Sequence, residues 1–158
     1  MENTWVRLVL ASSIDGRIAY PEGGETNLGL QGDRLVLEES LLWSDALLVG
    51  GQTLRDHQSI CLIKNAKLLK QRISEGKNSQ PISLVVSNQK DYPSDWSFFQ
   101  QPIQRWQLRN ETNYSERNIK KRFHKIIHLK STWLESLEIL RQEGLSKLSL
   151  LGGANLIR

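Results

Sequence analysis

Two glycine pairs follow apolar segments and could bring the backbone close to a phosphate group. Gly152–Gly153 follows Lys147–Leu151, and Gly50–Gly51 follows Ala46–Val49. Glycine has no side chain to hold a ligand away, and the free N–H groups of a following helix favour phosphate oxygens. The first pair therefore predicts a nucleotide-phosphate turn, although a tight connection between a strand and a helix would also use two glycines.

The second glycine pair is followed by two polar side chains that suit the same kind of ligand. Thr53 could donate a hydrogen bond and Arg55 a charge-assisted one, and Arg55 fits equally well as an ordinary surface arginine. Ligands of open α/β sheets bind at the carboxyl ends of the strands, where both pairs lie. The patterns G-x-G-x-x-G and G-x-x-x-x-G-K-S/T are absent from the sequence, which argues against a standard Rossmann or P-loop site.

The histidines and the single cysteine give little support to a metal site or to a protein nucleophile. His124 and His128 lie in a segment that favours a strand, where four residues span roughly 13 Å, too far apart to share an ion. His57 and Cys61 complete the set of histidines and cysteines, so no zinc site is expected. Cys61 stands between two apolar residues, which favours a buried and unreactive thiol.

Alternating apolar and amphipathic segments must position these residues. The expected helices are Asp33–Trp43 with Asp33 as its cap, Asn65–Gly76, and Thr132–Gln142, which starts with a capping box. The expected strands, the first of them covered on both faces, are Trp5–Ser12, Ala46–Val49, Pro81–Ser87, Gln104–Leu108, Lys125–Leu129 and Lys147–Leu151. This order predicts an α/β fold with a mostly parallel sheet.

Composition places the chain among single-domain globular proteins. It has 158 residues, of which 39% are hydrophobic and 24% charged. Because we find neither a signal peptide nor an apolar run of roughly 20 residues, and only one cysteine, we expect a cytoplasmic protein that binds no membrane. The net charge of +4 favours anionic ligands, and the scattered tryptophans do not form a base-stacking platform, so we expect no nucleic-acid partner.

Four segments, in order, resemble the reductase domain of riboflavin biosynthesis, a pyrimidine reductase of the dihydrofolate-reductase-like superfamily. They are LASSIDGRIA at 10–19, SDALLVGGQTLR at 44–55, PISLVVSN at 81–88 and LLGGANL at 150–156. The first two are the more specific. The resemblance implies a dihydrofolate-reductase-like fold, with a mixed, mostly parallel sheet flanked by helices. The resemblance spans residues 5–158, and we expect one reductase-like domain over residues 1–158, without a deaminase domain.

The same resemblance implies a reaction and a cofactor. The family reduces 5-amino-6-(5-phosphoribosylamino)uracil to its ribitylamino counterpart with NADPH as the hydride donor. The expected partner is thus a phosphorylated pyrimidine, and a homodimer is left open. Family members continue past the glycine turn with a full helix and further strands, so this chain is expected to be truncated at its C-terminus and incomplete as a domain.

Carried over position by position, the family pattern assigns roles to individual residues. Asp15, as the candidate catalytic residue, and Gly16 match the turn beside the nicotinamide. Glu25 and Asn27 fall in a loop that contacts the substrate, for which Arg55 is a further candidate. The remaining cofactor-binding residues are Ala11, Thr53, Gly152, Gly153, Ala154, Asn155 and Leu156.

Three positions depart from the family pattern. Asp56-His57-Gln58 stands where the family has Asp-Asp-Pro, Leu41 replaces a substrate-contacting arginine, and Leu151 replaces a substrate-contacting glutamate. These departures affect the substrate side more than the cofactor side. They support an alternative, a non-catalytic or differently specific nucleotide-binding homologue that has lost the substrate contacts.

Overall fold

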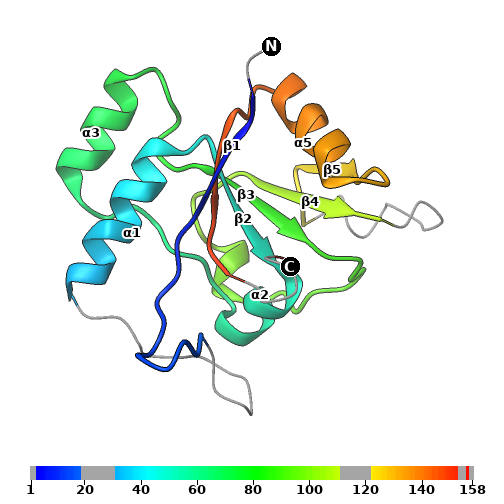
Figure 1. The fold of residues 1–158 in the computed structure, drawn as a ribbon, viewed down its shortest axis with the longest axis horizontal. Helices are drawn as coiled ribbons and strands as arrows, with labels where there is room; N and C mark the ends of the chain where they lie inside the picture. Colours follow the sequence, from blue (N-terminus) through cyan, green and yellow to red (C-terminus); the bar gives the residue numbers. More distant parts are fainter. Residues whose placement is uncertain (1–2, 19–30, 111–121, 153–155, 157–158) are drawn as a thin grey trace.

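A computed structural model of the chain describes residues 3–18, 31–110, 122–152 and 156. Its centre is one six-stranded sheet with the strand order β1-β6-β2-β3-β4-β5, and neighbouring strands are parallel throughout (Figure 1). The strands are β1 (Trp5–Leu8), β2 (Ala46–Gly50), β3 (Ile82–Val86), β4 (Arg105–Arg109), β5 (Lys125–His128) and β6 (Lys147–Leu150). The predicted α/β class with a mostly parallel sheet is confirmed.

Helices cover both faces of the sheet. They are α1 (Gln31–Trp43), α2 (Gly51–His57), α3 (Ala66–Ser74), α5 (Trp133–Gln142) and the short 3₁₀ helix η1 (Ser97–Phe99). α1 and α3 pack side by side on one face (Figure 1). Of the helices in the described residues, none is long and apolar enough to cross a membrane.

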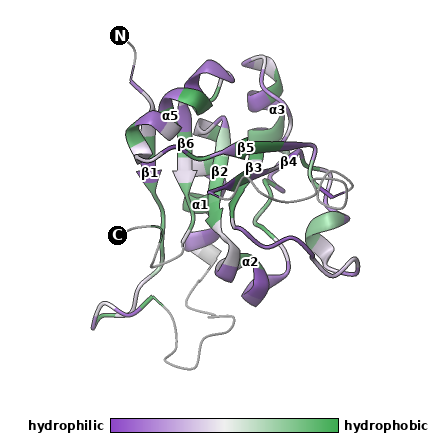
Figure 2. Cartoon of the chain, turned by 90° about the vertical axis from the view of Figure 1, so that its right-hand side faces the viewer, coloured by the Kyte–Doolittle hydropathy of each residue, from purple (hydrophilic) through white to green (hydrophobic). Residues whose placement is uncertain are grey.

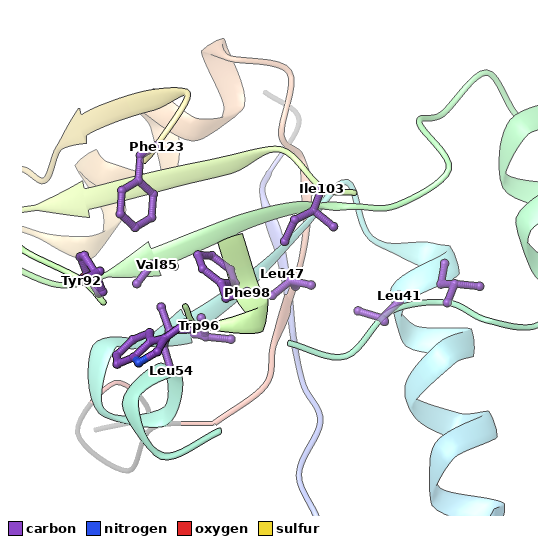
Figure 3. Packing of buried hydrophobic residues seen from close by; sticks show 11 residues of the cluster. Leu41, Leu47, Leu54, Val85, Tyr92, Trp96, Phe98, Ile103 and Phe123 are labelled. Atoms are coloured by element: carbon purple, nitrogen blue, oxygen red, sulfur yellow. The ribbon is translucent and has the colours of Figure 1, made fainter. Parts of the chain in front are cut away.

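The central strand β2 shows why both faces need a cover. Leu47 and Val49 join one buried cluster with residues of α1, α2 and η1, whereas Ala46 and Leu48 join a second cluster with Leu140 of α5. Successive side chains of a strand point to opposite faces, so a continuous apolar run serves two cores. Figure 2 shows β2 as a hydrophobic strand in the middle of the sheet. Figure 3 shows aromatic rings gathered around Val85 in the first cluster.

Local sequence signals set the ends of two helices, α3 and α5. The Asn65 side chain caps α3, and Thr132 and Glu135 form the predicted capping box of α5. Gly76 and Gly144 take positive φ angles just after these helices, as expected for glycines that end helices. Asp33 is not the cap of α1, because that helix already begins at Gln31 and places Asp33 in its first turn.

The first strand differs from the prediction. β1 ends at Leu8 instead of Ser12, and its four residues are exposed, with Trp5 at 67%. The cause is its place in the sheet: within the described residues β1 pairs only with β6 and forms an edge. An apolar run reads as a buried strand whether it becomes a central strand or an edge strand.

Polar side chains fix how β2 and β6 lie against each other. One oxygen of Asp45 accepts hydrogen bonds from the Ser146 N–H, the Ser146 hydroxyl and the Lys147 N–H, at 3.0, 3.1 and 2.9 Å. On α1, the Ser40 hydroxyl lies 2.8 Å from that of Ser149 in β6. These contacts fix β6 against β2 and α1. Because all neighbouring strands are parallel, their carboxyl ends meet at one edge of the sheet.

Candidate active site

The candidate site is a pocket of about 660 Å³ at the carboxyl edge of the sheet. Its walls come from the segment after β1, from α1, from the β2–α2 connection, from the loop that follows α2, and from the residue after β6. The lining residues are Val9, Leu10, Ala11, Asp33, Arg34, Val36, Leu37, Val49, Thr53, Leu54, His57, Ser59, Ile60, Cys61 and Leu151. The lining is mostly apolar, with a few polar groups, as is typical of small-molecule sites.

Three of the predicted cofactor residues meet at this edge. Ala11 and Thr53 line the pocket. Gly152 has a φ of 120°, and a Cβ built on it would lie 3.9 Å from both Oγ1 and Cγ2 of Thr53. The Thr53 hydroxyl makes no hydrogen bond to another described residue, so it remains available to a ligand.

The other glycine pair has a different explanation. Gly50 is the N-cap residue of α2 and Gly51 its first residue. This helix is not among the helices expected from the sequence. A Cβ at Gly51 would lie 2.7 Å from Oγ of Ser87, at the end of β3. Close packing of α2 on β3 thus requires glycine at this position, and phosphate contact is not needed to account for it.

Asp15 and Gly16 lie in an exposed turn and are not among the lining residues. The Asp15 carboxylate accepts a hydrogen bond from the Ser13 hydroxyl at 2.5 Å and lies 3.0 Å from Nε of Arg17. Gly16 has a φ of 80°, which a turn of this kind reserves for glycine. The catalytic role of Asp15 and the cofactor role of Gly16 stay predictions.

The remaining predicted residues lie elsewhere or outside the described residues. Arg55 points along the surface of α2, where its guanidinium donates to the side chains of Gln52 and Gln89 at 2.7 Å each, and it does not line the pocket. Leu156 packs against the second buried cluster. The residues that fall outside the description are Glu25, Asn27, Gly153, Ala154 and Asn155.

One wall of the pocket was not predicted from the sequence. The loop carrying Ser59, Ile60 and Cys61 lines the pocket. Gln101 holds this loop with two hydrogen bonds, accepting from the Ile60 N–H at 3.1 Å and donating to the Ile60 carbonyl at 2.8 Å. Gln80 binds Ile63 in the same way, at 3.0 and 2.8 Å. Both glutamines are distant in sequence, so no local pattern signals them.

A buried carboxylate ties this loop to α1. Glu38, only 4% exposed, accepts from Nε of Arg34 at 2.9 Å and from the N–H groups of Lys64 and Asn65 at 3.0 and 2.9 Å. Burial by itself raises the pKa of Glu38, but the hydrogen bonds from Arg34, Asn65 and Lys64 outweigh it, and the pKa is lowered. Glu38 is therefore an anion at neutral pH.

Cys61 is only partly buried and lines the pocket, so the predicted buried position is wrong, because the loop after α2 runs along the pocket wall. Burial, followed by the charge of Glu38, raises the pKa of the Cys61 thiol. A thiol with a raised pKa is a poor nucleophile. Within the described ranges no three metal-binding side chains come together to hold an ion.

Two of the departures from the family pattern have different structural meanings. Leu41 is fully buried in the first cluster and points into the core (Figure 3). Leu41 does not line the pocket, so its difference from the family's arginine does not bear on which ligand the pocket binds. Leu151 does line the pocket and makes its wall apolar where the family pattern has a carboxylate.

An open parallel sheet with a pocket at the carboxyl ends of its strands defines the class of α/β proteins that bind small ligands at that edge. Within this class, the chain belongs to the family described as the RibD C-terminal domain, a reductase-like family whose sequence model matches residues 4–158. No curated protein matches the chain by sequence.

Solved structures share the fold. A pyrimidine reductase-like protein from Corynebacterium diphtheriae has a TM-score of 0.74 and 20% identity over 95% of this chain and 66% of its own. A diaminohydroxyphosphoribosylaminopyrimidine deaminase/5-amino-6-(5-phosphoribosylamino)uracil reductase from Thermotoga maritima has a TM-score of 0.72 and 17% identity, over 98% of this chain and 40% of its own. A riboflavin biosynthesis reductase from Saccharomyces cerevisiae has a TM-score of 0.65 and 15% identity, over 99% of this chain and 66% of its own. This chain thus spans between 40% and 66% of the length of these proteins.

Proposed function

We propose that the chain is an NADPH-dependent reductase of the riboflavin-biosynthesis type, which converts 5-amino-6-(5-phosphoribosylamino)uracil to its ribitylamino product. The observation that carries the proposal is that Ala11 and Thr53 line one pocket and that Gly152 lies beside Thr53, although the three residues come from separate segments of the chain. Membership of the reductase-like family supports the same reaction class.

The residues present fit a nicotinamide nucleotide. Val9, Leu10 and Val49 offer an apolar wall for a flat ring, and the Thr53 hydroxyl lies among them without a hydrogen-bond partner in the described residues. Gly152 leaves no side chain opposite Thr53, which allows a ligand to approach the backbone. When bound, NADPH supplies the hydride. The chain would contribute a mostly apolar site that orients the reactants, and a hydride transfer of this kind requires neither a metal nor a protein nucleophile.

A titration and a turnover assay test this proposal. Binding of NADPH and NADH is followed by the fluorescence of the reduced nicotinamide, and turnover by loss of absorbance on addition of the phosphoribosylamino-uracil. We expect saturable NADPH binding and substrate-dependent oxidation. Failure to bind either cofactor would refute the proposal.

The alternative is a nucleotide-binding homologue without this activity or with another substrate. Leu151 favours it, because an apolar side chain stands in the pocket wall at the position of the family's glutamate. Cofactor binding without oxidation in the presence of the phosphoribosylamino-uracil would select this alternative, and turnover of that substrate would eliminate it. The variant Leu151→Glu distinguishes further, since a gain of turnover would assign the loss to this one side chain.

A further inference from the structure

Arg34 is a pocket residue that neither the glycine turns nor the family pattern singled out. It lies in the first half of α1 and lines the pocket together with Asp33 and Val36. Its side chain is half exposed, so the guanidinium reaches the space that a ligand would enter. Besides Arg34, the charged or titratable side chains in the lining are those of Asp33, His57 and Cys61.

The guanidinium of Arg34 is held on one side only. Its Nε donates to Oε1 of Glu38 at 2.9 Å, and Glu38 is itself fixed because Oε2 accepts from the backbone of Lys64 and Asn65. The four N–H donors on the two terminal nitrogens of Arg34 have no acceptor in the described residues. An arginine fixed through Nε presents these donors in a preset plane, which suits two oxygens of one anion.

We propose that Arg34 binds a phosphate monoester in this pocket and that Glu38 is the residue that positions it. The proposal rests on the proposed function, which supplies two such groups: the 5-phosphate of the ribosylamino substrate and the 2′-phosphate of NADPH. Both carry a terminal phosphate with oxygens free to accept two parallel N–H bonds, and the net positive charge of the chain favours anions of this kind.

Binding of small probes tests the proposal without turnover. Calorimetric titrations of wild type compare ribose 5-phosphate with ribose, and adenosine 2′-phosphate with adenosine. We expect at least one phosphorylated probe to bind tenfold or more tightly than its counterpart, and Arg34→Gln to abolish that preference. Arg34→Lys keeps the positive charge but cannot donate two parallel hydrogen bonds, so it should keep only part of the preference for the phosphorylated probe.

Steady-state kinetics then tell the two phosphate sources apart. If Arg34 holds the substrate, Arg34→Gln raises KM for the phosphorylated substrate at least tenfold, leaves kcat within a few-fold and leaves the NADPH-over-NADH preference intact. If it holds the cofactor, the same variant lowers the NADPH-over-NADH preference instead. Glu38→Gln should change whichever of these two quantities Arg34→Gln changes, in the same direction and by a smaller factor. The guanidinium is still present in this variant, but the carboxylate that fixes its Nε is lost.

Arg141→Gln is the matched control. Arg141 forms a similar arginine–glutamate pair with Glu138 on α5, with Nε 2.9 Å from Oε2, and does not line the pocket. This variant should behave as wild type in every arm. The proposal is overturned if wild type shows no preference for either phosphorylated probe, or if Arg34→Gln leaves both the preference and the kinetics unchanged. A preserved probe preference with no oxidation of NADPH would instead count against the reductase and leave the phosphate site standing.

Discussion

Gly152 faces Thr53 across the edge of the sheet, with the Thr53 side chain 3.9 Å from the point where a Cβ of residue 152 would be. Thr53 lies in the first turn of α2, directly after β2, and Gly152 follows β6; these two strands are neighbours in the sheet and distant in sequence. The Thr53 hydroxyl can both donate and accept a hydrogen bond, and it lines the pocket beside a backbone that carries no side chain at residue 152. The first prediction follows from this pair.

Thr53→Ala should weaken NADPH binding by roughly 1 to 3 kcal/mol, the cost of a lost hydrogen bond in a partly dry site. Thr53→Ser keeps the hydroxyl and should bind nearly as wild type. Gly152→Val should also weaken binding, because it places a branched side chain against Thr53 and because a φ of 120° strains any residue with a side chain. Fluorescence titration measures all three, with thermal unfolding to check the fold. Wild-type affinity in Thr53→Ala would remove this residue from the site.

Asp45 should matter for stability and little for the ligand. Asp45→Ala removes the acceptor of three hydrogen bonds from Ser146 and Lys147, so we expect a loss of about 2 kcal/mol in the free energy of unfolding. Urea denaturation measures it. The exposed Asp95 provides the control, and Asp95→Ala should stay within about 0.5 kcal/mol of wild type. Equal stabilities of the two variants would contradict a register role for Asp45.

The parts of the fold that could be predicted are those that short-range chemistry determines. Thr132 and Glu135 predict the start of α5 because a capping box is complete within four residues. The exposure of β1 could not be predicted, because it depends on which strands lie beside Trp5 and not on Trp5 itself. α2 was missed because its seven residues follow directly on a strand without a loop between them.

The candidate site divides in the same way. Thr53 and Gly152 could be predicted because they stand next to strand ends, and strand ends of a parallel sheet meet at one edge. Arg34 and the loop around Ile60 could not, because their positions depend on Glu38 and Gln101, which reach them from other parts of the chain. No spacing in the sequence encodes such a contact.

Glu38 predicts how stability depends on pH. Its pKa in the folded chain lies below the ordinary value of 4.5, so its contribution is fully present above that value and is lost as the pH falls through the folded pKa. Glu38→Gln should therefore be less stable than wild type at pH 7, by about 2 kcal/mol from weakened charge-assisted hydrogen bonds, and the difference should shrink in acid. Denaturant melts from pH 7 downward measure it. The exposed neighbour Glu39 is the control, and a Glu38→Gln curve parallel to that of Glu39→Gln would refute the assignment.

Gln101 predicts a local effect on the pocket wall. Gln101→Ala leaves the N–H and the carbonyl of Ile60 without their partners at 3.1 and 2.8 Å, so the loop carrying Ser59, Ile60 and Cys61 should open more often. Hydrogen exchange read by mass spectrometry should show faster exchange in peptides covering 58–64, while those of the central strand β2 stay protected. The adjacent Gln100 is exposed, and Gln100→Ala should exchange as wild type. If the loop has the assigned place in the pocket, Gln101→Ala also weakens NADPH binding several-fold. Unchanged exchange in 58–64 would show that other contacts hold this wall.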